Sequence, residues 1–188
     1  MKLKLLLIAS AAMIISSCSK NNDELPIPQT TETGEEIAAK KKEKPFNGVL
    51  TLHPDATAQL SCGCAPGFFE IGPFSGSGVM TDLGFTTAIT TPCVGFIPNG
   101  LHADTQCVTF VSANGDELYM VAAAPYDNVL NPVTNLITGT GTFNITGGTG
   151  KYQDASGSYS ATVINNQLIA PAGTPPTVIT IITGSIIY

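Results

Sequence analysis

The sequence predicts an all-β protein organised around a single antiparallel β-barrel, and three observations support this fold class. Residues 45–188 are rich in Val, Ile, Thr, Tyr and Phe, which favour strands over helices. Gly, Pro and Asn interrupt this segment at short intervals, and no apolar pattern with the 3.6-residue helical period is sustained. About eight short strands are typical of a closed barrel, with a β-sandwich as the alternative.

The strands are placed by alternating apolar and polar residues and by turn residues between them. Polar side chains alternate with Phe143 and Ile145, as in a strand with one buried and one solvated face. Asn114-Gly115 lies between two apolar runs and predicts a hairpin with a tight type I′ turn. The expected strands are 46–52, 68–74, 78–90, 106–113, 117–124, 137–145, 156–164 and 178–187.

The first residues of the chain predict export and lipidation. Two lysines precede the apolar run 5–15, which is too short to cross a bilayer as a permanent helix. The run closes with Ile15-Ser16-Ser17-Cys18, which resembles the bacterial lipobox. We therefore expect a signal peptide over 1–17 and acyl chains, palmitate among them, on Cys18. An ordinary secretory signal in which this cysteine is incidental is the alternative.

Residues 18–44 predict a flexible tether between the lipidated cysteine and the folded body. They are rich in Asn, Glu, Thr, Pro and Lys and contain few large apolar residues, so they cannot offset their ordering entropy by burial. Several acyl chains hold a protein on a membrane far more firmly than one. We expect a lipid-anchored envelope protein, and Ser19 after the cysteine favours the outer membrane, on its periplasmic face or at the cell surface.

Residues 45–188 predict one domain, and its charge excludes several partners. The body holds eight acidic residues against the single cation Lys151, and the chain contains no arginine. Nucleic acid is excluded because binding a phosphate backbone needs several Lys or Arg contacts. Sites that clamp carboxylates or phosphates with two parallel hydrogen bonds are disfavoured for the same reason. No cofactor or metal is expected.

Four cysteines in the body predict two disulfides in a chain that matures outside the reducing cytosol. We favour bridges from Cys62 and Cys64 to Cys93 and Cys107, in either pairing, because a bridge between residues two apart closes a strained ring. The alternative is a zinc or redox site formed by the four thiols with His102. Cys-Gly-Cys is tighter than the usual Cys-x₂-Cys spacing of zinc ligands.

A glycine-rich segment carries a resemblance to a known family. Residues 141–152 read GTFNITGGTGKY and are followed by ASGSY at 155–159. This strand, turn and strand resembles the allene oxide cyclase-like and dirigent-like β-barrels, and segments 76–84, 113–118 and 184–188 agree with bacterial members. Asp82 departs from the pattern, which has histidine there. The resemblance implies an antiparallel barrel, often oligomeric in plant relatives, whose function varies widely.

The same glycines do not predict a phosphate-binding loop. A Walker loop opens onto a helix and carries Lys followed by Ser or Thr, whereas Lys151 is followed by Tyr152 and then by another expected strand. Glycines that supply positive φ in a tight turn are the simpler interpretation.

Candidates for catalysis are few. His102 with Asp104 is expected in a loop between two cysteines, Glu70 adjoins two phenylalanines, and Asp82 replaces the family histidine. None of these residues forms a known catalytic pattern, so no catalytic residue is assigned. Enzymatic turnover is therefore not the favoured hypothesis.

Three functions remain open from the sequence. The first is a membrane-tethered barrel that binds a small apolar ligand or another envelope component. The second is a cyclase-like or isomerase-like enzyme, which predicts an apolar cavity containing a buried carboxylate. The third is a structural protein that forms homo-oligomers and whose barrel is filled by side chains.

Overall fold

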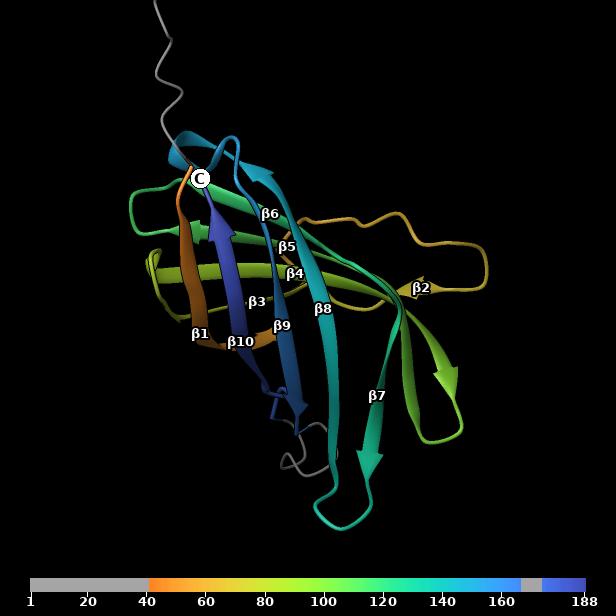
Figure 1. Ribbon diagram of the computed structural model, residues 1–188. Helices are drawn as coiled ribbons and strands as arrows, with labels where there is room; N and C mark the ends of the chain where they lie inside the picture. The colour runs from red at the N-terminus through yellow and green to blue at the C-terminus, as the bar shows by residue number, and fades with distance from the viewer. Residues whose placement is uncertain (1–40, 167–173) are drawn as a thin grey trace, which may run out of the picture. The chain divides into compact units, whose positions relative to one another are not determined.

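The described residues form a closed antiparallel barrel of eight strands, as expected from the sequence (Figure 1). The computed structural model describes residues 41–166 and 174–188, so the predicted signal peptide, Cys18 and most of the tether lie outside them. In order around the wall, the strands are β1 (Glu43–Pro54), β3 (Phe74–Met80), β4 (Gly84–Ile97), β5 (Gly100–Ser112), β6 (Glu117–Ala122), β8 (Leu136–Gly148), β9 (Ser156–Asn165) and β10 (Val178–Ile187).

The ring closes through long runs of antiparallel pairs. β1 pairs with β10 from Glu43 opposite Ile187 to Leu52 opposite Val178. β4 pairs with β5 along almost its whole length, from Thr86 to Ile97. Every wall strand therefore has two neighbours, which satisfies its backbone donors and acceptors and leaves the barrel no free edge.

One position in the wall is filled by two short strands in succession. β6 pairs with the second half of β5, and β7 (Tyr126–Asn131) pairs with its first half, while both pair with β8. Pro125 lies between them and has no N–H to donate to the ladder. The sequence expectation of a strand at 117–124 matches β6 within two residues, but it missed β7, because Asp127, Asn128 and Asn131 are unfavourable strand residues that gave this segment no strand signal.

Two other expected strands are wrong in extent. The segment 68–74 contains only the two-residue β2 (Phe69–Glu70) and the start of β3, with Gly72 at φ +103° between them. The segment 78–90 is divided by a turn in which Asp82 and Gly84 both have φ +72°. This turn reverses the chain from β3 to β4. The expected strands ended β4 too early and began β5 too late, because Pro98-Asn99 forms a hairpin beyond the barrel rim.

The turn between β5 and β6 is a hairpin, but its type differs from the expectation. Gly115 has φ +88°, whereas Asn114 is not among the residues with positive φ, so the turn is not type I′. The glycine segment does act as a turn. Gly147 and Gly150 have positive φ, and a 3-10 turn (Gly150–Tyr152) follows. A Cβ on Gly150 would lie 1.9 Å from Asp116 Oδ1, so only glycine fits there.

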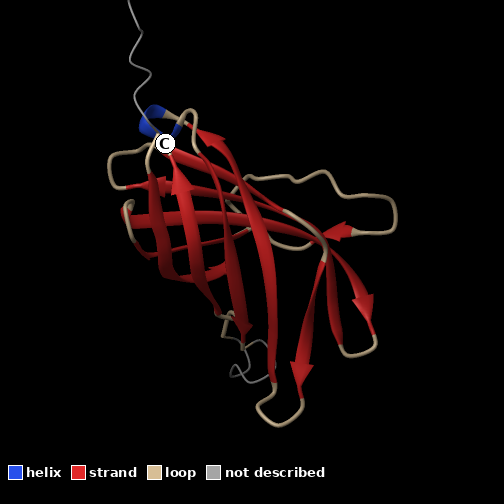
Figure 2. Cartoon of the chain, in the orientation of Figure 1, coloured by secondary structure: helices blue, strands red, loops and turns tan. Residues whose placement is uncertain are grey.

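The barrel interior is packed most tightly in the half that contains the chain's C-terminus. Phe143 and Tyr159 stack with ring centroids 5.1 Å apart, and Phe46 and Phe110 pack around them. Along β8, Phe143 and Ile145 are buried while their polar neighbours are exposed, which confirms the predicted alternation. Almost all regular structure is strand (Figure 2). Among the described residues, no helix is long and apolar enough to cross a membrane.

Candidate functional site

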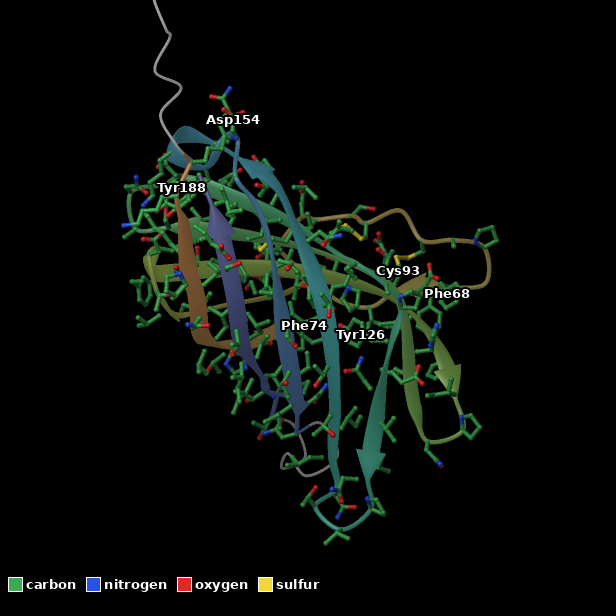
Figure 3. All side chains as sticks on the ribbon, in the orientation of Figure 1. Phe68, Phe74, Cys93, Tyr126, Asp154 and Tyr188 are labelled. Carbon is green, nitrogen blue, oxygen red and sulfur yellow. A yellow bond between two sulfur atoms is a disulfide. The ribbon has the colours of Figure 1, made fainter. Side chains whose placement is uncertain are left out.

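The candidate site is a pocket in the half of the barrel away from the C-terminus. Its outer chamber has a volume of about 70 Å³, and its lining is mainly apolar. In Figure 3, Phe74 and Tyr126 lie in this half, and Tyr188 lies at the other end. The outer chamber is lined by Leu52, Ile71, Phe74, Thr90, Pro92, Val94, Leu101, Gln106, Tyr126, Asn128, Ile137, Val163, Asn165, Val178 and Thr180.

A smaller inner chamber of about 20 Å³ continues toward the aromatic core. It shares five lining residues with the outer chamber, Gln106 and Thr180 among them. Its far wall is formed by Phe143 and Tyr159, whose rings close the barrel. Tyr159 therefore lies between the inner chamber and the aromatic core.

A directional chain of hydrogen bonds crosses the pocket. The Tyr126 hydroxyl donates to Oε1 of Gln106, the Gln106 Nε2 donates to the Thr90 hydroxyl at 2.5 Å, and that hydroxyl donates to the Cys107 carbonyl at 3.0 Å. This chain fixes the orientation of the Gln106 amide. One Nε2 hydrogen and one oxygen lone pair remain for a ligand.

Burial controls the protonation of the pocket tyrosines. It raises the pKa of Tyr126 to about 12, against an opposing hydrogen bond with Asn128. Burial also raises the pKa of Tyr159 well above its ordinary value, and the nearby Tyr126 adds to the effect. Both groups are neutral hydroxyls at physiological pH.

Two disulfides fix the loop that forms one side of the pocket. Cys62 pairs with Cys107 and Cys64 with Cys93, each with a Cα–Cα distance of 5.4 Å. These bridges follow the expected pattern and leave no free thiol for the alternative zinc site. Cys93 lies between Pro92 and Val94, two residues of the pocket wall, and the Ile71 N–H donates to the Pro92 carbonyl at 3.1 Å. Cross-links and backbone bonds thus hold the wall in place.

Glu70 belongs to the short strand β2 and lines neither chamber of the pocket. Its Oε1 accepts hydrogen bonds from the Ser61 hydroxyl at 2.7 Å and from the Cys62 N–H at 2.8 Å. These bonds lower the pKa of Glu70, which matches a carboxylate that organises a loop rather than a catalytic acid. Its carboxylate also lies within 4.8 Å of the Cys64 and Cys93 sulfurs, but both sulfurs are in the disulfide.

His102 and Asp104 are not in a loop, contrary to the sequence expectation. Both belong to β5, and Asp104 occupies a bulge, because Val94 pairs with Ala103 whereas Cys93 pairs with Thr105. His102 instead meets Asp127 across the strands, with Nδ1 and Oδ1 2.6 Å apart. Neither the His102 nor the Asp104 side chain lines the pocket.

Asp82 lies at the opposite end of the barrel. It accepts hydrogen bonds from Lys44 at 3.3 Å and from the Tyr188 hydroxyl, so it joins the start of β1 to the end of β10. Its role in the described structure is to hold the two ends of the body together. The structure therefore places none of the four candidate residues from the sequence in the pocket. These residues are Glu70, Asp82, His102 and Asp104.

The residues that line the pocket are ones that sequence reasoning missed. Gln106, Tyr126 and Thr180 carry no motif, and their common feature is their position on inward faces of different strands. Inward alternation identifies such faces within one strand, but it does not indicate which strands lie opposite each other.

Comparison with known proteins gives distant likenesses. No protein-family model and no curated protein matches the chain. Two solved structures of pterocarpan synthase dirigent proteins do match. One is 14% identical over 79% of this chain and 89% of its own length, with a TM-score of 0.37. The other is 12% identical over 79% and 97%, with a TM-score of 0.35. Identities and TM-scores this low carry no argument about this chain. The barrel fold is established by the strand pairing described above.

Proposed function

We propose that this protein binds a small, largely apolar ligand in the barrel pocket and does not convert it. The observation that carries the proposal is an apolar pocket crossed by a fixed chain of polar groups from Tyr126 to Thr90. Binding sites typically combine an apolar lining with a few oriented polar groups. The outer chamber is about half the size of an engineered cavity of about 150 Å³ that takes benzene, so a larger ligand projects from its opening.

The pocket lining argues against turnover. A cyclase-like enzyme predicts a buried carboxylate, and the residues that line both chambers include no Asp, Glu, His, Lys or Cys. The remaining hydroxyls and amides are neutral and poorly suited to general acid or base catalysis at neutral pH. Their chemistry is that of recognition.

A pocket-filling variant tests the binding proposal. Val163 lines both chambers, whereas its neighbour Thr162 faces the other side of β9 and contacts Thr140. Small molecules that co-purify with the protein, or that bind from an apolar compound library, are measured by mass spectrometry. We expect V163F to lose them and the matched T162F to retain them. Retention by both variants would place the ligand elsewhere, and no bound compound at all would remove the proposal.

We also propose that the chain is a lipoprotein anchored in the bacterial outer membrane through Cys18. The proposal rests on the lipobox-like segment that ends at this residue and on the polar composition of the residues that follow. Globomycin, which blocks lipoprotein signal peptidase, should cause an uncleaved form to accumulate. C18S should abolish labelling by radioactive palmitate. Cleavage and membrane fractionation that are unchanged in C18S would contradict lipidation.

Self-association is a second candidate role, favoured by one surface. Phe85, Val79, Val49 and Ile181 are all exposed, and they pair in register across the adjacent strands β4, β3, β1 and β10. The six adjacent strands from β8 through β4 contain no charged residue except Glu43 and Lys44, at the start of β1. We call these four side chains the apolar row.

A second copy of this chain is the occupant that the charge distribution favours. The body is strongly acidic, and its strand-borne carboxylates lie on β5, β6 and β7 and on the short β2. Two copies can therefore meet at the apolar row without bringing carboxylates together. Sedimentation equilibrium should show association that V79E weakens, with V129E on β7, an exposed strand valine away from the apolar row, as the matched control. A monomer at every concentration would refute this role.

A further inference from the structure

We infer that the inner chamber recognises one uncharged oxygen atom of the ligand, a hydroxyl or a carbonyl, and that the pocket thereby selects neutral ligands over ions of the same length. This inference rests on the proposed binding function and specifies the ligand class. The inner chamber is lined by Leu50, Leu52, Thr90, Gln106, Val108, Phe143, Tyr159, Ala161, Val163 and Thr180.

Size is the first argument. The inner chamber has a volume of about 20 Å³. A bound water needs roughly 10–15 Å³ measured in this way, so the chamber has room for one oxygen-sized group. A carboxylate or ammonium group that retained its hydration shell would not fit. An ion could enter only after losing that shell.

The absence of charge is the second argument. None of the described residues that line either chamber is Asp, Glu, Lys, Arg or His. A dehydrated ion in such a lining has no opposite charge to compensate the lost hydration, which is one of the most costly arrangements in a protein interior. Dehydration costs a hydroxyl or carbonyl far less free energy, because neutral hydrogen-bonding groups in the chamber replace its bound water.

Unpaired polar groups at the end of the pocket are the third argument. Tyr159 is 3% exposed, and its hydroxyl makes no hydrogen bond with any described residue. The hydroxyl of Thr180, which lines both chambers, also has no hydrogen-bond partner among the described residues. Among the described residues, the buried side-chain atom without a hydrogen-bond partner is Asn128 Oδ1, in the wall of the outer chamber, whereas the Tyr159 hydroxyl borders the inner chamber. A hydroxyl that faces an apolar chamber contributes little more to stability than phenylalanine would until a polar group reaches it. The Tyr159 hydroxyl becomes favourable when a ligand oxygen joins it.

The directional chain also presents a donor to the same chamber. Because Gln106 directs its oxygen to Tyr126 and one Nε2 hydrogen to Thr90, its second Nε2 hydrogen remains for an acceptor. A ligand oxygen can accept from this amide and exchange a hydrogen bond with the tyrosine hydroxyl. A hydroxyl can donate as well as accept, which makes an alcohol the simplest probe.

Three probes of equal chain length test the selectivity. The mature full chain in lipid nanodiscs is titrated at pH 7 with 1-hexanol, hexanoate or hexylammonium, with empty nanodiscs correcting for partition. The readout is the Gln106 side-chain amide resonance, which reports the inner chamber. We expect 1-hexanol to bind roughly 30-fold more tightly than either ion. An ion that binds within threefold of the alcohol overturns the selectivity but leaves the binding function intact.

Failure of the binding function gives a different result. If no probe moves the Gln106 resonance and the neutral alcohols from four to eight carbons also fail, the proposed function and this inference are both overturned. Binding of neutral and charged probes alike contradicts only the inference. The two failures are therefore distinguishable in one set of titrations.

Variants separate recognition from a structural role. Y159F removes only the hydroxyl, so we expect unchanged or higher stability, about tenfold weaker binding of 1-hexanol and unchanged binding of n-hexane. T180V should act in the same direction. The control is Y119F, because the exposed Tyr119 bonds to Glu117 outside the pocket at 2.5 Å. Equal losses for alcohol and alkane in Y159F would assign the residue to packing and overturn the inference.

Discussion

The two disulfides should stabilise the protein less than additively, because each bridge shortens the loop that the other must close. Cys62–Cys107 spans 45 residues and Cys64–Cys93 spans 29 within it. We call Cys64–Cys93 the inner bridge and Cys62–Cys107 the outer bridge. When the inner bridge is present, the outer bridge closes a loop that runs through the inner disulfide and is shorter than the full 45-residue loop. Only one residue on one side and thirteen on the other lie between the bridges along the chain.

Loop-closure entropy gives the expected magnitudes. In the intact protein the shorter path makes the outer bridge worth about 3 kcal/mol at 25 °C. Without the inner bridge, the outer bridge closes the full loop and is worth about 4 kcal/mol. Replacing Cys62 and Cys107 by serine should therefore cost about 1 kcal/mol more in a background that already carries C64S and C93S.

The assay is a double cycle of four proteins, each unfolded by urea and followed by far-UV circular dichroism. All four are measured in the same concentration of sucrose, which favours the folded state and keeps the protein without disulfides within range. Tyrosine fluorescence gives a second signal, because the chain contains no tryptophan. An equal cost in both backgrounds, or a larger cost in the intact protein, would refute the loop-closure reasoning.

Three further substitutions have expected outcomes. A Cβ on Gly141 would lie 2.7 Å from the Tyr126 ring, so G141A should cost about 1–3 kcal/mol by displacing it, measured by urea unfolding. Hydrogen bonds, first from Ser75, hold the pKa of Asp55 at about 2, below its usual 3.8. Because the folded-state pKa is depressed, its stabilisation is complete above about pH 4 and is lost as the pH falls through 2. D55N should flatten stability over that range, and an unchanged acid profile would contradict this. D82A should speed amide exchange at the start of β1, where Lys44 loses its partner, and unchanged exchange would contradict this role for Asp82.

The sequence predicted the fold class well because the relevant signals are local. Strand-forming residues, period-two alternation and glycine turns act over a few positions, and they correctly gave a barrel of about eight strands. Local signals failed where a single residue changed the course of the chain. Asp82 adopts positive φ and ends β3, and Pro125 divides one wall position between β6 and β7.

The candidate site was not predictable in the same way, because its chemistry depends on strands that are distant in the sequence. The residues chosen from the sequence were the charged ones, and the structure places Glu70 on the short β2, bonded to the adjoining loop, and Asp82 at the opposite end of the barrel. Charged groups avoid a dry interior unless they are paired, so the inside of this barrel was left to neutral residues. Those residues carry no motif that distinguishes them from ordinary core residues.

By itself, the sequence determined an all-β body, two disulfides formed across the chain rather than between neighbouring cysteines, and a strongly acidic charge. Only the tertiary structure decided that a pocket exists, how large it is and which groups face it. The physical reason is that a pocket is the space left when side chains from several strands meet. Register and barrel closure set that space, and Gln106 and Tyr159 acquire a shared role only when β5 and β9 face each other across it.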